Sequence, residues 1–130
     1  MNVLYEYLLA LVIFVVIDLT WLSLVALKIY RKEIGKILLD KPKKVSSVFF
    51  YLLYILGLVF FVLNPSISRS SFNFSLIGGL LFGLVTYSTY DLTNLATLKG
   101  WSRYITIIDM IWGTILTGIV SILVFYIFVR

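Results

Sequence analysis

The 130-residue sequence contains no cysteine and no histidine. Without cysteine the chain can form no disulfide, no thiolate metal site and no thiol nucleophile. Without histidine it has no imidazole base and no ligand for haem or for a histidine-rich iron or zinc centre. These absences exclude more chemistry than any motif in the chain supports, and we assign no cofactor and no metal ligand from the sequence.

Charged residues are also scarce. They make up 13% of the chain, whereas 62% of its residues are hydrophobic and the mean hydropathy is +1.07. A soluble domain typically has about 25% charged residues, so the outer surface of this chain must face lipid. The length suits a single domain spanning residues 1–130.

Four apolar stretches are long enough to cross a hydrocarbon core of ~30 Å as helices. They cover residues 3–27, 45–63, 74–98 and 104–129, and Asn64-Pro65 is predicted to end the second. The first stretch lacks a basic start and contains Asp18, so we interpret it as a retained helix rather than a cleaved signal peptide. The sequence therefore predicts an all-α, integral membrane four-helix bundle.

A basic segment, residues 28–44, follows the first span and holds seven of the eleven Lys and Arg residues. Tyr30, Ile34, Ile37 and Leu38 recur within it at helical spacing. The segment is predicted to form a short amphipathic interfacial helix lying on the membrane surface. It could simply set orientation, or it could also bind anionic lipid headgroups. The side chains for such binding are Arg31, Lys32, Lys36, Lys43 and Lys44.

Charge also predicts the orientation of the bundle. Loops 28–44 and 99–103 carry nine Lys and Arg residues, and the opposite side carries only Arg69 and Arg130. The positive-inside rule then places both loops in the cytoplasm and both termini outside, N-out/C-out. No basic face interleaved with exposed aromatic residues is visible, so we expect no nucleic-acid partner.

Three aspartates, Asp18, Asp91 and Asp109, interrupt the apolar spans. Counted from flanking basic residues, they lie roughly 9–15 Å inside the cytoplasmic boundary. Each would cost about 2.5–3.5 kcal/mol or more facing lipid, so we expect them to face inward and form one polar layer. The spans contain no cation, so protonation, a bound cation or water must compensate the acids. The helix dipole favours an ionised Asp109 and a protonated Asp91.

Polar and aromatic residues share helix faces with these acids. Asp18 and Asp109 each precede a tryptophan by three residues, which places each pair on one helix face. Gly79 and Gly83 would let helices approach closely. An alternative is that the acids only join helices through hydrogen bonds. The candidate ligand-binding residues are Asp18, Trp21, Tyr54, Tyr87, Asp91, Asn94, Asp109 and Trp112.

Several motifs carry a family resemblance. They are Tyr90-Asp91-Leu92-Thr93-Asn94-Leu95-Ala96-Thr97-Leu98, Trp101, Asp109-x-x-Trp112-Gly113, Asp18-x-x-Trp21 and Phe50-Tyr51-Leu52-Leu53-Tyr54. With these motifs the whole chain resembles the small bacterial membrane proteins grouped as domain of unknown function 2177. The resemblance implies a four-helix protein of the bacterial inner (plasma) membrane, and it implies no activity.

The carboxylate layer predicts binding or transport of a small cationic, polar or lipid-like ligand, coupled to protons and open to the cytoplasm. Transport by four helices is expected to need a homo-oligomer. A first alternative is a membrane-embedded enzyme that modifies a lipid or an isoprenoid. It would use an aspartate as acid or base, or a divalent cation bound by carboxylates. A second alternative is an accessory subunit of a membrane complex.

Overall fold

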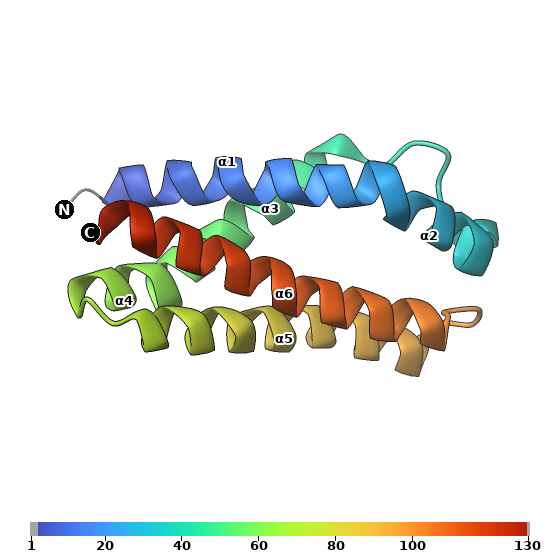
Figure 1. Ribbon diagram of the computed structural model, residues 1–130. Helices are drawn as coiled ribbons and strands as arrows, with labels where there is room; N and C mark the ends of the chain where they lie inside the picture. Colours follow the sequence, from blue (N-terminus) through green and yellow to red (C-terminus); the bar gives the residue numbers. More distant parts are fainter. Residues whose placement is uncertain (1–2, 130) are drawn as a thin grey trace.

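A computed structural model describes residues 3–129 and shows four long helices arranged as a bundle (Figure 1). Each is long and apolar enough to cross a membrane, and the described residues contain no strand. The predicted all-α membrane bundle is therefore confirmed. The first helix contains α1 (Val3–Trp21) and α2 (Leu27–Ile34), the second α3 (Lys44–Leu58) and α4 (Asn64–Ser68), the third α5 (Phe72–Thr97) and the fourth α6 (Arg103–Phe128).

The first helix runs without a break from Val3 to Ile37. A π-helical turn, Leu22–Ala26, joins α1 to α2, and a 3-10 turn, Gly35–Ile37, ends the run. Beyond the π-helical turn, α2 bends toward α6 (Figure 1), so that Tyr30 and Ile34 face the bundle. The amphipathic segment is thus helical and continuous with the first span. Its position on the membrane surface stays a prediction.

The sequence predicts that the second helix ends at Asn64-Pro65. In the structure the helix continues beyond this point. A π-helical turn, Val59–Leu63, follows α3, and α4 then continues the helix through Pro65 to Ser68. Proline is tolerated in the first turn of a helical segment, where its missing N–H is not required. The wider π-helical turn before it further relaxes the hydrogen-bond register. Pro65 therefore lies within the second helix.

The third and fourth helices start at serine caps. The hydroxyl of Ser71 accepts a hydrogen bond from the backbone N–H of Phe74 at 3.1 Å, and Ser102 accepts one from Ile105 at 3.2 Å. Such caps satisfy N–H groups that have no partner inside the helix. Both helices begin within two residues of the predicted positions.

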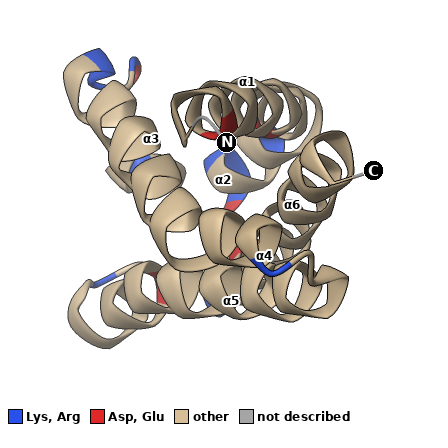
Figure 2. Ribbon diagram, turned by 90° about the vertical axis from the view of Figure 1, so that its left-hand side faces the viewer, with Lys and Arg blue, Asp and Glu red and all other residues tan. Residues whose placement is uncertain are grey.

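Both basic loops lie at one end of the bundle, and the two chain termini lie at the other (Figures 1 and 2). We refer to these as the basic end and the terminal end. This arrangement agrees with an even number of spans. Which end faces the cytoplasm stays a prediction from the charge distribution.

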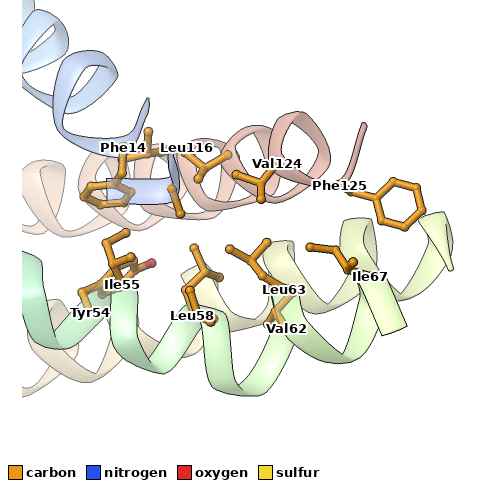
Figure 3. Close-up of a cluster of buried hydrophobic side chains, with 13 residues drawn as sticks. Phe14, Tyr54, Ile55, Leu58, Val62, Leu63, Ile67, Leu116, Val124 and Phe125 are labelled. Atoms are coloured by element: carbon orange, nitrogen blue, oxygen red, sulfur yellow. The ribbon is translucent and has the colours of Figure 1, made fainter. Parts of the chain in front are cut away.

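The apolar core occupies the terminal half of the bundle (Figure 3). Phe14 of α1, Leu63 of the second helix and Leu116 of α6 are fully buried within it. Glu6 is also fully buried in this half, and its carboxylate oxygens lie 3.3 and 3.4 Å from the amide nitrogen of Asn64. The Glu6–Asn64 contact joins the first helix to the second at the terminal end.

Helices α5 and α6 pack closely because glycines line their contact. A Cβ atom added to Gly83 would overlap the backbone oxygen of Gly113, and one added to Gly113 would overlap the ring of Tyr87. Gly79 similarly lies against Ser121. Small residues permit such close backbone approach between helices in membranes. The close helix approach predicted from Gly79 and Gly83 is confirmed.

Gly113→Ala and Gly83→Ala are each expected to destabilise the bundle by about 1–3 kcal/mol, because the added methyl groups overpack the α5–α6 contact. Gly35→Ala is the matched control, since no atom lies within 4 Å of its added Cβ. Thermal unfolding in detergent should show lower melting temperatures for the first two variants alone. Equal melting temperatures for all three would contradict the close contact.

Candidate functional site

Asp18 is held by donors from two other helices. The hydroxyl of Tyr51 in α3 donates a hydrogen bond of 2.7 Å to one carboxylate oxygen, and the indole N–H of Trp112 in α6 donates one of 3.1 Å to the other. Trp21, one turn beyond Asp18, stacks on Trp112 with ring centroids 4.4 Å apart and planes inclined by 10°. Both oxygens of Asp18 therefore accept a hydrogen bond from another helix.

Asp109 lies in the second turn of α6 and is 7% exposed. The hydroxyl of Tyr30 donates a hydrogen bond of 2.7 Å to one of its oxygens. Tyr30 can reach this position because the π-helical turn bends α2 toward α6. Asp109 therefore receives one donor from the chain, whereas Asp18 receives two.

Asp91 is completely buried, and no donor of the described residues reaches either of its carboxylate oxygens. Its side chain lies within hydrogen-bonding reach of Asp109, on the adjacent helix. Two ionised carboxylates are both acceptors, so a hydrogen bond between them requires one proton on the pair. A buried polar group without a partner costs about 1–3 kcal/mol.

A cavity of about 600 Å³ lies in the basic half of the bundle, beyond the apolar core. Asp18 and Asp109 are its charged lining residues, and among the described residues no Lys or Arg lines it. The remaining lining residues are aromatic, hydroxylated or aliphatic: Trp21, Leu22, Tyr30, Ser46, Ser47, Phe50, Tyr51, Tyr54, Thr86, Tyr87, Tyr90 and Trp112. The cavity thus combines two carboxylates with eight aromatic side chains.

The floor of the cavity is fixed by the tyrosines of α3 and α5. The hydroxyl of Tyr54 lies 2.5 Å from that of Thr117, and its ring meets the ring of Tyr87 edge to face at 6.0 Å. Tyr87 in turn lies against the backbone of Gly113. These contacts separate the polar cavity from the apolar core below it.

Six of the eight residues predicted for the site line the cavity, namely Asp18, Trp21, Tyr54, Tyr87, Asp109 and Trp112. The other two residues do not line the cavity. Asp91 lies beside Asp109, and Asn94 interacts with Tyr90. The three aspartates occupy one half of the bundle in two groups rather than one continuous layer. Their protonation states and their role in ligand binding stay predictions.

Several lining residues are not among those predicted from the sequence, above all Tyr30 and Tyr51. Tyr51 shares a helix face with Tyr54, and this spacing could have identified it. Tyr30 lies within a run of basic residues, which is typical of a loop or a surface helix. Its contact with Asp109 depends on the π-helical turn, for which the sequence gives no clear signal.

Comparison with known proteins supports a membrane family. The family model described as a predicted membrane protein, DUF2177, matches residues 3–126. The chain has no significant match among curated proteins or among solved structures. The match agrees with the four spans and carries no activity with it.

Asp91→Asn is expected to keep or raise the melting temperature at neutral pH, because an amide N–H can donate to Asp109 without an added proton. Asp91→Ala should lower it, since Asp109 then loses its neighbour and a cavity is left behind. Asp40→Asn, in an exposed loop, should change nothing. A large loss of stability in Asp91→Asn, comparable with that in Asp91→Ala, would contradict the acceptor–acceptor contact.

Proposed function

The chain belongs to the DUF2177 family of predicted membrane proteins, and we propose that it binds a small organic cation in the cavity between its helices. One observation carries the proposal: the cavity contains two carboxylates and eight aromatic rings, and no described Lys or Arg lines it. Negative charge inside a membrane span is costly unless a partner compensates it. A cationic ligand supplies that partner.

The aromatic rings favour an organic ammonium over a hydrated metal ion. An ammonium group placed over a tryptophan or tyrosine ring gains about 0.5–1 kcal/mol at an exposed site and about 2 kcal/mol or more when it is desolvated. The stacked Trp21 and Trp112 present such a surface directly beside Asp18. A ligand between these rings and Asp109 would have negative charge on two sides.

Binding is proposed to be coupled to a proton shared by Asp91 and Asp109. The charged and titratable groups around this pair are Tyr30 from α2, Tyr87 and Tyr90 from α5 and, across the cavity, Asp18 from α1. None of them is a cation. A ligand cation beside Asp109 favours release of the shared proton, because both compensate the same negative charge.

The position of the cavity favours binding over transport by a single chain. It occupies the basic half, and the apolar core around Phe14, Leu63 and Leu116 fills the terminal half. A path to the terminal end would require that core to open, or a second copy of the chain to complete the route. Binding is therefore the function we propose, with transport as its extension in a homo-oligomer.

Asp18 is better suited to charge compensation than to acid–base catalysis. Donors from Tyr51 and Trp112 hold both of its oxygens, which keeps it an acceptor. A catalytic acid or base needs an oxygen that can exchange a proton with the substrate. The geometry of Asp18 thus favours a binding role for this residue over the catalytic role in the enzyme alternative.

Binding of tetraethylammonium to the protein in lipid nanodiscs, measured by calorimetry, tests the proposal. Asp18→Asn and Asp109→Asn are each expected to weaken binding about tenfold or more, because each removes a counter-charge in the cavity worth at least about 1.4 kcal/mol. Asp40→Asn, an equivalent change in an exposed loop, should bind like the parent. Circular dichroism checks that all variants are folded. No binding to the parent, or equal binding to all variants, would exclude this function.

The same measurement as a function of pH tests the proton. Affinity for the parent is expected to rise with pH, because the cation and the shared proton compete for the same negative charge. Asp91→Asn cannot hold that proton and should show a flatter dependence. If the affinity of the parent protein stays constant across the pH range in which it is folded, cation binding is not coupled to a proton.

We further propose that anionic lipid headgroups bind at the basic end. A groove of about 750 Å³ there is lined by Arg31, Lys32, Lys36 and Lys99, together with Glu33. Glu33 accepts a hydrogen bond of 2.6 Å from Ser102, and its single negative charge is outnumbered by the four cations of the groove. Lys43 and Lys44, at the start of the second helix, lie outside this groove and add to the basic charge of the same end.

Replacing Arg31, Lys32 and Lys36 together by Gln is expected to reduce retention of phosphatidylglycerol by up to about a hundredfold, since each basic residue near an anionic surface contributes about 1 kcal/mol. Native mass spectrometry of protein released from mixed-lipid nanodiscs measures this retention against phosphatidylcholine. Arg69→Gln, at the terminal end, should leave it unchanged. Similar loss in both variants would show that the groove has no special role.

A further inference from the structure

The wall of the cavity is open on one side. Phe50 of α3 and Tyr90 of α5 both line the cavity, and they are 45% and 56% exposed. Ser46, one turn before Phe50, also lines the cavity and is exposed. Between these residues α3 and α5 diverge toward the basic end (Figure 2). The cavity therefore has a lateral opening between α3 and α5.

Contacts on either side limit this opening. Toward the terminal end, the ring of Tyr54 meets that of Phe82 with centroids 5.3 Å apart, and Gly57 lies against Phe82. On the other flank of α3, the hydrogen bond from Tyr51 to Asp18 joins α3 to α1. The opening is thus confined to the first turns of α3.

The opening lies at membrane depth. Phe50 is six residues from the start of α3, and Tyr90 is seven residues from the end of α5. At 1.5 Å per residue both lie about 9–10 Å inside their spans. An aromatic opening at this depth faces lipid acyl chains rather than bulk water.

The geometry points to an amphiphile as the ligand: a single-chain alkyl ammonium whose cationic head lies in the cavity and whose chain leaves between α3 and α5. This inference rests on the proposed binding of a cation and adds the chemical class of the ligand. The head would lie between Asp18 and Asp109, and the chain would pass Phe50 and Tyr90 into the bilayer. Such a ligand places its charge beside the carboxylates and leaves its apolar part in lipid.

Comparison of dodecyltrimethylammonium with tetramethylammonium tests the inference, with both probes measured on the protein in phosphatidylcholine nanodiscs. The dodecyl probe should bind at least tenfold more tightly after correction for its partition into empty nanodiscs. Ser46→Trp, which fills the opening, should weaken the dodecyl probe about tenfold, and it should weaken the dodecyl probe more than it weakens tetramethylammonium. Val48→Trp is the control, because Val48 is 56% exposed and does not line the cavity; it should change neither probe.

A measurement on a protein that keeps Ser46 guards against misfolding of Ser46→Trp. In a Trp101→Phe background, fluorescence of Trp21 and Trp112 should be quenched by a dodecyl probe brominated near its head. A probe brominated at the end of its chain should quench no more than brominated lipid does. Equal quenching by both probes would place the chain inside the cavity and overturn the inference.

The remaining outcomes separate the inference from the function on which it rests. If tetramethylammonium binds as tightly as the dodecyl probe, the cation site stands and the amphiphile is excluded. If neither probe binds the parent, the proposed function fails and the inference fails with it. A second copy of the chain covering the opening would appear as a dimer that Ser46→Trp dissociates, and this result would also overturn the assignment.

Discussion

The close contact between α5 and α6 is the constraint on which the rest of the structure depends. In a bilayer, helices gain little from hiding apolar side chains from one another, so close packing of small residues must hold them together. Gly83 and Gly113 provide this packing, and it brings the two helices near enough for Asp91 to lie against Asp109. The same contact seats Tyr87 on the backbone of α6, where its ring forms part of the cavity floor. A larger residue at Gly113 would therefore disturb the packing, the carboxylate pair and the cavity together.

Hydrogen-bond donors divide the three acids into different chemical environments. Asp18 receives two donors, Asp109 receives one, and Asp91 receives none from the described residues. In a chain without histidine, and with its Lys and Arg residues outside the predicted spans, tyrosine hydroxyls and a tryptophan N–H take the place of cations. They solvate the carboxylates but cannot neutralise them. Negative charge therefore remains in the cavity, and this residual charge is what makes an external cation or proton the natural partner.

Much of the fold could be predicted from the sequence because hydropathy and length determine membrane spans directly. The acids could be placed near one depth by counting residues from basic ends, and the paired spacing of Asp18–Trp21 and Asp109–Trp112 correctly put each pair on one helix face. The sequence could not reveal that these faces meet, with Trp21 stacked on Trp112, because that contact depends on how α1 and α6 cross. The role of Tyr30 and the passage of helix through Pro65 both depend on π-helical turns. Such turns have no reliable sequence signal, so these two features could be found only in the structure.

The contact between Glu6 and Asn64 has a mechanical consequence. It lies at the terminal end, beside the apolar core, whereas the opposite end of the second helix has exposed side chains such as Val45 and Phe49. Between these ends, hydrogen bonds from Tyr51 to Asp18 and between Tyr54 and Thr117 also hold the helix. The second helix is thus fixed from Tyr51 to Asn64, and only its first turns are free to move. Five residues separate Ser46 from Tyr51, so the free arm is about 7–8 Å long, and a rotation of about 10° would move Ser46 by only about 1 Å. The opening between α3 and α5 therefore keeps nearly the same width while the core stays packed.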